Sequence, residues 1–343
     1  MRVRRPTSAD VAAEAGVSRT TVSLVLNEAP GVSISESTRS RVREVAGRLG
    51  YQPHHSARGL AAGKSHTLGL VLRQTPEQVA SDAFLPQTLR GVVTAARSSR
   101  YRVLVEPIAP GHDRYVDLVR SGRTDGLLIS GPRIDDDDDL AQISSEGFPI
   151  VIQGSLPGTS TPSVDIDNVA SARLAVEHLV ALGHRRVACI TNAPLAYTAA
   201  RDRLEGYHAA LRRAGFEAPD ELVVEGAFDA PSGRLAMNLL LGRRPPSAVF
   251  VASDIVALGA IAAINDAGFR VPEDISVIGF DDVPLAAYFD PPLTTIRLPA
   301  FELGLAAGRA LLDRIAGRDV PARTLLSTEL IVRASTGAPA GGG

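Results

Sequence analysis

The chain has 343 residues, of which 45% are hydrophobic and 22% charged, and its formal net charge is −2. This composition is typical of a globular protein of two or three domains and excludes a disordered chain. No apolar run reaches the length of a membrane span, and the N-terminus lacks the apolar core of a signal peptide, so we expect a cytoplasmic protein with no membrane partner. The single cysteine, Cys189, excludes an internal disulfide and thiolate metal clusters.

Charge is unevenly distributed along the chain. Residues 1–66 hold ten Arg or Lys residues and five acids, which gives +5 for this segment and leaves −7 for the remainder. A basic head on an acidic body is typical of a protein whose N-terminal part meets a polyphosphate while its body does not.

Residues 7–27 predict two short helices joined by a tight turn. Thr7 can cap the first helix, Gly16 supplies the positive φ of a sharp turn, and Ser18 can cap the second helix. Apolar residues at helical spacing give both helices a buried face: Val11, Ala12, Ala15, Val22, Val25 and Leu26. This is the geometry of a helix-turn-helix, whose second helix enters the DNA major groove. An αα-corner in an ordinary helical domain has the same turn and remains the alternative.

The side chains left exposed on the second helix favour DNA. Ser18, Arg19, Thr20, Thr21 and Ser23 are short donors plus one guanidinium, which suit phosphates and base edges. A third helix over residues 36–49, capped by Ser35, would complete a small bundle.

Residues 51–65 predict a linker that contains a very short helix over residues 57–62, which needs a partner to form. Leu60 is an exposed apolar side chain in this basic linker. Its glycines and Lys64-Ser65 imitate a phosphate loop, but Arg58 occupies a position where that loop requires glycine, so we predict no nucleotide site.

From residue 67 onwards, short apolar strands alternate with amphipathic helices, which predicts an α/β body of two doubly wound parallel sheets. The predicted strands cover residues 67–72, 103–105, 126–129, 150–152, 187–191, 222–225, 249–252, 276–279 and 330–332. The predicted helices cover residues 87–98, 169–182, 203–214, 232–241, 255–267 and 300–315. Ligands on such sheets bind at the carboxyl ends of the strands, so we expect a site in the cleft between the two subdomains.

Together these stretches resemble the LacI/GalR (lac-repressor) family of bacterial transcription regulators. The resemblance covers nearly the whole chain and rests on the head TSADVAAEAGVSRTTVSLVLN, the linker YQPHHSARGLAAGKSHTLGLV and the body blocks RLEGY, SDIVALGA and VIGFDDVPLAAYFDPPLTTI. It implies a helix-turn-helix domain over residues 1–52, a hinge helix or linker over 53–66 and a periplasmic-binding-protein-like effector and dimerisation domain over 67–334. The implied division of the body is a first subdomain of about 67–161 plus 297–320, a second of about 162–296 plus 321–334, and a flexible tail over 335–343.

The resemblance implies an effector-responsive repressor of carbohydrate uptake or catabolism genes. It would bind a palindromic operator in double-stranded DNA as a homodimer or a dimer of dimers, with Arg19 and Thr20 facing base edges and Leu60 wedged between central base pairs in the minor groove. The implied DNA-binding residues are Thr7, Ser18, Arg19, Thr20, Thr21, Ser23, Asn27, His54, Ala57, Arg58 and Leu60.

For the body, the resemblance implies a small carbohydrate-like effector in the cleft. Arg203 and Asp281 match the arginine and carboxylate that bind the effector in the family, and Phe84, Phe228 and Asp254 lie at other lining positions. An arginine, two carboxylates and aromatic rings suit a polyhydroxylated ligand. For each residue taken separately, a structural role remains the alternative, because buried Arg–Asp pairs often only fasten a domain together.

Two other functional classes compete with this interpretation. A ligand-binding protein of the periplasmic type without DNA function is disfavoured by the basic head and by the lack of a secretion signal. A sugar-modifying enzyme on the same scaffold is disfavoured because no positioned base, nucleophile or metal set occurs, so we predict no catalytic residue, no metal and no cofactor. The residues leave open whether the effector acts as an inducer or as a corepressor.

Overall fold

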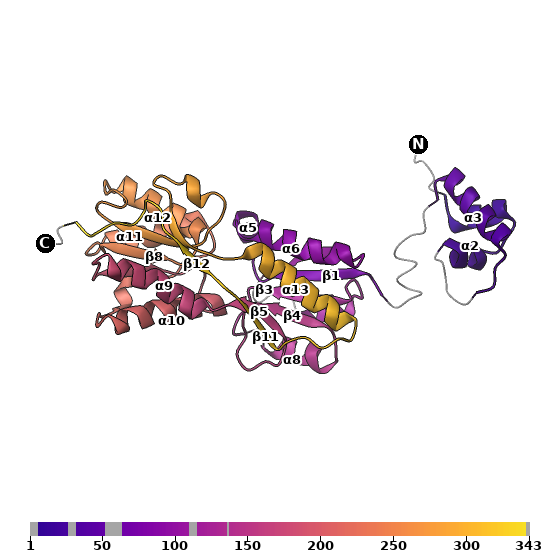
Figure 1. Cartoon of the computed structure of the whole chain (residues 1–343), viewed down its shortest axis with the longest axis horizontal. Helices are drawn as coiled ribbons and strands as arrows, with labels where there is room; N and C mark the ends of the chain where they lie inside the picture. Colours follow the sequence, from indigo (N-terminus) through magenta and orange to yellow (C-terminus); the bar gives the residue numbers. More distant parts are fainter. Residues whose placement is uncertain (1–5, 27–31, 52–63, 110–114, 136, 341–343) are drawn as a thin grey trace. The chain divides into compact units, whose positions relative to one another are not determined.

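The computed structural model describes all residues except 1–5, 27–31, 52–63, 110–114, 136 and 341–343. The chain divides into two compact units, residues 1–66 and 67–343 (Figure 1). Among the described residues, no helix is long and apolar enough to cross a membrane.

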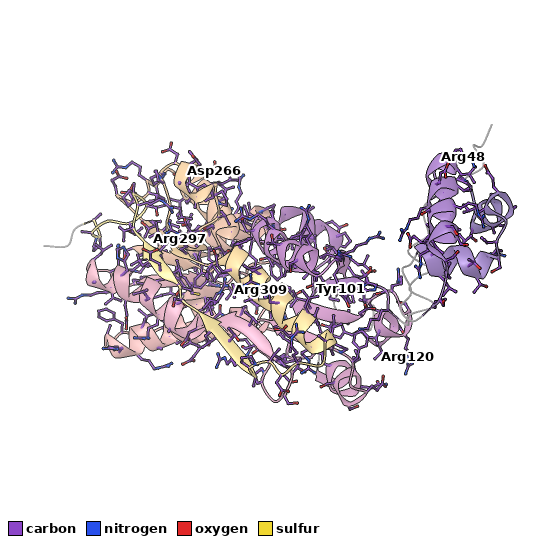
Figure 2. The ribbon with its side chains drawn as sticks, turned by 45° about the vertical axis from the view of Figure 1, so that its right-hand side comes forward. Arg48, Tyr101, Arg120, Asp266, Arg297 and Arg309 are labelled. Atoms are coloured by element: carbon purple, nitrogen blue, oxygen red, sulfur yellow. The ribbon has the colours of Figure 1, made fainter. Side chains whose placement is uncertain are left out.

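The first unit is a three-helix bundle of α1 (Ser8–Ala15), α2 (Arg19–Leu26) and α3 (Glu36–Leu49). Its core is small and aliphatic, and it consists of Val11, Ala12, Ala15, Val22, Val25, Val42, Val45 and Ala46. An ion pair of 2.6 Å between Arg48 Nη2 and Glu14 Oε1 joins α3 to α1 on the surface. Figure 2 labels Arg48 on this three-helix unit. The predicted helices and their buried faces are confirmed here.

The second unit contains two six-stranded sheets, each covered by helices on both faces, as a doubly wound fold requires (Figure 1). The first sheet has the order β11-β5-β4-β3-β1-β2, and all its neighbouring strands run parallel. Its strands are β1 (Thr67–Leu72), β2 (Arg102–Pro107), β3 (Gly126–Ser130), β4 (Ile150–Gln153), β5 (Ser163–Ile166) and β11 (Arg323–Leu326). Its helices are α5 (Pro76–Ser81), α6 (Leu85–Ser98), α7 (Tyr115–Arg120), α8 (Asp137–Ser145) and α13 (Ala300–Ile315). We call this part the first lobe.

The second sheet has the order β12-β10-β9-β8-β6-β7, and only the edge strand β12 runs antiparallel. Its strands are β6 (Val187–Ile190), β7 (Val223–Val224), β8 (Ala248–Val251), β9 (Ser276–Asp281), β10 (Thr294–Arg297) and β12 (Glu329–Ile331). Its helices are α9 (Asn168–Ala181), α10 (Thr198–Arg213), α11 (Ala230–Leu241) and α12 (Asp254–Asp266), with the short 3₁₀ turns η1 (Asp220–Leu222) and η2 (Ala286–Tyr288). We call this part the second lobe.

Three short crossings connect the lobes: after β5, after β10, and between β11 and β12. Two of the expected subdomain boundaries therefore differ from the structure. Residues 163–166 and 323–326 pair with each other in the first sheet, whereas the family resemblance implies that both belong to the second subdomain. The reason is that β5 and β11 form the edge of the first sheet, and the chain crosses only after they end.

The expected flexible tail over residues 335–343 is wrong for its first residues. The Ser335 side chain is completely buried. Its Oγ donates to Val277 O (2.6 Å) and accepts from Thr294 N (2.8 Å). The carbonyl of Gly337 lies 2.9 Å from Nε2 of the buried His184. These bonds attach residues 335–337 to the second sheet.

Close helix packing positions one wall of the cleft. Gly91 of α6 and Gly304 of α13 face each other so closely that a Cβ at Gly91 would lie 2.2 Å from Phe301 O, and one at Gly304 would lie 2.1 Å from Thr88 O. Only glycine fits at both positions. This contact fixes the position of the first turn of α6, including Thr88, against α13.

Candidate functional site

The first unit carries a helix-turn-helix whose geometry is determined locally. The Thr7 side chain accepts from Asp10 N, and the Asp10 carboxylate accepts from Thr7 N at 2.8 Å, which forms a complete capping box. Gly16 ends α1 with a φ of +63°, and Ser18 Oγ accepts from Thr21 N at 3.0 Å at the start of α2. The two predicted caps and the turn are therefore present.

Polar side chains near the starts of α1 and α2 are exposed to solvent. Thr7, Ser18, Arg19, Thr20 and Ser23 are exposed. Thr21 is half-buried, and its hydroxyl lies 2.9 Å from that of Ser18. Exposed donors at a helix N-terminus can contact phosphates and base edges. The other expected DNA contacts, Asn27, His54, Ala57, Arg58 and Leu60, lie outside the described residues.

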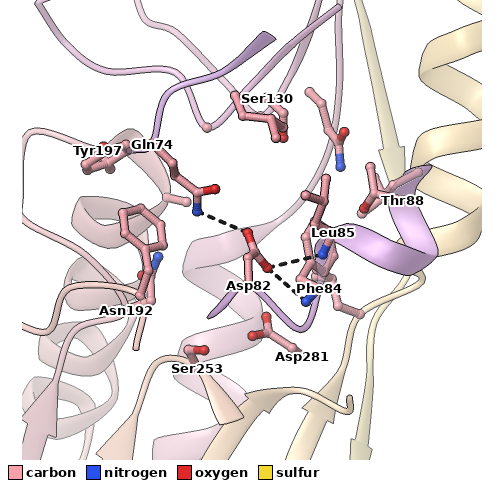
Figure 3. Close-up of a pocket in the computed structure, with 18 of the residues that line it drawn as sticks. Gln74, Asp82, Phe84, Leu85, Thr88, Ser130, Asn192, Tyr197, Ser253 and Asp281 are labelled. Atoms are coloured by element: carbon pink, nitrogen blue, oxygen red, sulfur yellow. Dashed lines mark hydrogen bonds between the residues drawn. The ribbon is translucent and has the colours of Figure 1, made fainter. Parts of the chain in front are cut away.

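The second unit carries a pocket between its two lobes, with a cavity volume of about 140 Å³ (Figure 3). Residues at or just beyond the carboxyl ends of five strands line it: Leu72, Ser130, Gln153, Asn192 and Asp281. The pocket therefore lies where doubly wound sheets bind their ligands.

Arg203, on α10, is held in the pocket by contacts on several sides. Its side chain is 9% exposed, Nε donates to Asn168 Oδ1 (3.0 Å), and Nη1 donates to Ala252 O (2.7 Å). Nη1 lies 3.6 Å from Asp281 Oδ1, and the guanidinium carbon lies 3.8 Å from the centre of the Phe280 ring. This side chain is rigid and pre-oriented, as a ligand-binding guanidinium needs to be.

Asp281 ends β9 with a φ of +120°, in a region that L-residues rarely adopt. Burial raises the pKa of its carboxyl to about 7, although Arg203 opposes this rise. The predicted pair Arg203 and Asp281 is thus brought together at the pocket.

The network continues into the first lobe. Asn168 Nδ2 donates to Asp165 on β5 at 3.2 Å, and Asn168 Oδ1 accepts from Arg203. Burial raises the pKa of Asp165 to about 6. A chain of polar contacts therefore runs from β5 through Asn168 and Arg203 to Asp281.

Asp254, expected at a lining position, is not among the residues that line the pocket. It is completely buried at the start of α12, where Oδ1 accepts from Thr295 Oγ1 (2.7 Å) and Oδ2 from Val283 N (2.9 Å). Burial and the nearby Asp281 raise its pKa well above the ordinary value for aspartate. The side chain fastens β10 and the loop after β9 to α12.

The two predicted aromatic residues line the pocket from opposite lobes. Phe84 precedes α6 in the first lobe, and Phe228 lies in the second lobe with a φ of +69°. The ring of Phe228 meets that of Tyr197 edge to face, with 4.9 Å between the ring centres.

Asp82 is the main pocket residue that the sequence did not predict. Its Oδ1 accepts from Phe84 N (2.8 Å) and Leu85 N (3.1 Å), and Oδ2 accepts from Gln74 Nε2 (3.0 Å; Figure 3). Burial raises the pKa of this carboxyl. Asp82 also raises the pKa of Asp281, so the two lobes present carboxylates to each other across the pocket.

Other polar lining residues were also missed: Gln74, Thr88, Ser130, Gln153, Asn192 and Tyr197. Four of them, Gln74, Ser130, Gln153 and Asn192, end or directly follow a buried apolar strand, and this pattern could have identified them. Thr88 and Tyr197 had no such signal.

Tyr197 joins the lobes at one edge of the pocket. Its hydroxyl donates to Arg73 O of the first lobe. Beside it, Thr198 N donates to Pro132 O (3.2 Å), Ile134 N donates to Ala196 O (2.9 Å), and the Arg133 guanidinium lies 4.9 Å from the Tyr197 ring centre. Tyr197 therefore both lines the pocket and holds the two lobes together.

Comparisons with known proteins match both units of the chain. A family model described as "Bacterial regulatory proteins, lacI family" matches residues 7–54, and one described as "Periplasmic binding protein-like domain" matches residues 176–336. The HTH-type transcriptional regulator CelR of Thermobifida fusca is 37% identical, with 97% of this chain and 99% of the relative aligned. The HTH-type transcriptional repressor CytR of Escherichia coli (strain K12) is 35% identical, with 96% of each chain aligned.

Solved structures show the same architecture. A lac repressor dimer bound to operator and the anti-inducer ONPF matches with a TM-score of 0.84 and 32% identity, over 98% of this chain and 100% of that one. A CelR–cellobiose complex matches with a TM-score of 0.74 and 35% identity, over 96% of this chain and 100% of that one. The fold and the two sites thus define a helix-turn-helix transcription regulator with a periplasmic-binding-like body. The chain belongs to the lacI family of bacterial regulatory proteins.

Proposed function

We propose that this protein represses genes of carbohydrate uptake or catabolism by binding a palindromic operator, and that a sugar-like effector in the pocket between the lobes changes its operator affinity. The observation that carries the proposal is that one chain holds both an exposed, capped recognition helix and a pocket of buried carboxylates with a pre-oriented arginine. Relatives titled as a cellobiose complex and as a ribose operon repressor of Escherichia coli (strain K12) support a sugar-like ligand.

The pocket gives the effector a way to act. Its walls come from both lobes, so a ligand that binds them unequally in two lobe arrangements shifts the equilibrium between those arrangements. Contacts such as those of Tyr197 would form or break with the lobe angle. Residues 53–66 connect the body to the head, and we propose that their Leu60 inserts into the minor groove only in one arrangement.

A surface patch supports assembly as a homodimer. In the single chain, Leu235 and Leu239, one turn apart on α11, are 68% and 56% exposed. Leu258, on the helix α12 that packs against α11, is 40% exposed. Large apolar side chains that are exposed on neighbouring helices are typical of a protein interface. A symmetric partner is also what a palindromic operator requires.

The proposed dimer can be tested by placing a charge in this patch. Leu239→Glu should give a monomer in sedimentation and weaken operator binding, because only one half-site would then be held. Leu174→Glu on α9, where the leucine is 39% exposed, is the matched control and should remain a dimer. A dimeric Leu239→Glu would place the interface elsewhere.

The function itself is tested by a gel shift with the upstream region of the protein's own operon, with and without neutral sugars. We expect sequence-selective, salt-sensitive binding that changes when an effector is added. A decrease with effector identifies an inducer and an increase a corepressor. Sugar binding without any selective DNA binding would instead support a ligand-binding protein without DNA function.

A further inference from the structure

Three side chains that line the pocket have buried polar atoms without a hydrogen-bond partner in the protein. They are Thr88 Oγ1, Gln153 Oε1 and Asn192 Oδ1, on residues that are 1%, 6% and 9% exposed. A buried polar atom without a partner costs about 1–3 kcal/mol, so a group of such atoms around one pocket calls for an explanation. Thr88 and Gln153 come from the first lobe and Asn192 from the second, and in Figure 3 Thr88 and Asn192 lie on opposite sides of Asp82. All three can accept a hydrogen bond, and the Thr88 hydroxyl can also donate one, which indicates a ligand rich in hydroxyl groups.

The charges around the pocket disfavour an anionic ligand. Asp82, Asp165 and Asp281 line it, and Arg203 is the only cationic side chain among the described lining residues. Arg203 already lies beside Asp281 and donates to Asn168 and Ala252. A phosphate or carboxylate on the ligand would face an excess of carboxylates, and like charges at close range cost several kcal/mol.

The volume of the pocket limits the size of the ligand. The cavity volume of about 140 Å³ is close to the ~150 Å³ of an engineered lysozyme cavity that holds one benzene. With the lobes as they stand, this leaves room for one six-membered ring. Phe84, Phe228 and Leu298 supply apolar surface against which the C–H faces of such a ring can pack.

We propose that the effector is an uncharged, single-ring polyol, whose hydroxyls donate to Asp82, Thr88, Gln153 and Asn192, and that the pocket rejects the phosphorylated and carboxylated forms of the same ring. The inference rests on the proposed function, since it specifies the ligand of the same pocket. It makes Thr88, Gln153 and Asn192 specificity-determining residues.

The ligand class is tested by calorimetric titration of the full-length protein with neutral aldohexoses, aldopentoses and inositols, each beside its phosphate, its acid and its amino derivative, and with cellobiose. At least one neutral monocycle should bind, and its phosphate and acid should bind more than about 100-fold more weakly. The proposal is overturned if no neutral monocycle binds, or if an anionic form, an amino sugar or cellobiose binds more tightly than every neutral monocycle.

The role of the partnerless atoms is tested with the neutral monocycle that binds. Thr88→Val keeps the side-chain shape and removes a hydroxyl that has no partner in the protein, so the melting temperature of the unliganded protein should not fall. Its affinity for the ligand should fall about tenfold. Thr124→Val is the matched control, because Thr124 Oγ1 is also buried and without a partner but lies outside the pocket lining. Equal affinities of the two variants would remove Thr88 from the ligand contacts.

The carboxylate that rejects anions is tested by Asp82→Asn, which keeps the oxygen that accepts from Phe84 and Leu85. The ratio of neutral to phosphorylated affinity should shrink at least tenfold, and an unchanged ratio would contradict the charge argument. A gel shift of the wild-type protein separates the two levels of failure. If the protein binds its operator selectively but binds an anionic or larger ligand most tightly, only this inference is refuted. If it does not bind its operator, the proposed function is refuted.

Discussion

The head and the pocket achieve their function in opposite ways. In the head, Thr7, Asp10, Gly16 and Ser18 bond to neighbours within a few residues, and the side chains offered to DNA stay in water. In the pocket, the polar side chains are buried, extend from Gln74 to Asp281 along the chain, and include carboxyls with raised pKa values. Substitution of the exposed Arg19 or Thr20 should therefore lower operator affinity with little loss of stability, whereas substitution of Arg203, which has partners within the protein, should also lower stability.

Arg203→Ala should have the largest effect, because it leaves Asp281 and Asp165 without their cation and Asn168 Oδ1 and Ala252 O without a donor. Removing one partner of a buried ion pair costs roughly 3–5 kcal/mol. We expect a melting temperature lower by about 10 °C and no effector response in a gel shift. Arg48→Ala, in an exposed pair of the head, is the control and should change stability by less than about 1 kcal/mol. A normal effector response of Arg203→Ala would exclude Arg203 from the site.

Leu60→Ala tests whether the head depends on a wedge as well as on the recognition helix. Unstacking a base step and bending DNA onto the protein involves a few kcal/mol. Operator affinity should fall more than tenfold in fluorescence anisotropy, with effector affinity unchanged in calorimetry. An equal loss of both affinities would refute the wedge.

Asp281→Asn tests the buried carboxyls through pH. The pKa of Asp281 is raised to about 7 in the folded protein, so the folded state binds more protons than the unfolded chain between about pH 4 and 7. The stability contributed by the protonated form is complete below this window and is lost as pH rises through 7. Wild-type stability should thus fall relative to Asp281→Asn by on the order of 2 kcal/mol from pH 5 to 8. Parallel melting curves of the two proteins against pH would disprove the raised pKa.

Thr7→Ala should have the smallest effect. It removes the capping box of α1 and should destabilise the head by about 1 kcal/mol in thermal unfolding. Effector affinity should not change, because the cap lies in the other unit. Reduced effector affinity would show that the two regions are less separate than their contacts suggest.

The same contrast explains what the sequence could predict. The elements of the head were predicted with nearly their observed bounds, because caps, turn glycine and apolar spacing all lie within one short segment. The body strands with continuous apolar runs, such as β1, were also found. By contrast, β5, β10 and β11 (SVDI, TTIR and RTLL) mix polar and apolar residues and depend on partner strands far along the chain, so they were missed.

The pocket was predicted in part for the same reason. Resemblance to the family identified Arg203, Asp281, Phe84 and Phe228, all of which line it. Asp254 follows a strand end but bonds to Thr295, which only the packing of β10 reveals. Asp82 and Thr88 depend on how α6 packs against α13, more than two hundred residues later, and no local pattern marks that contact.

The most direct test of coupling between head and pocket is a fluorescence anisotropy titration of operator DNA with and without a saturating neutral monosaccharide that calorimetry shows to bind. We predict that the two operator Kd values differ at least fivefold, as expected for a coupling free energy of about 1 kcal/mol or more. Identical Kd values with the pocket occupied would contradict the account.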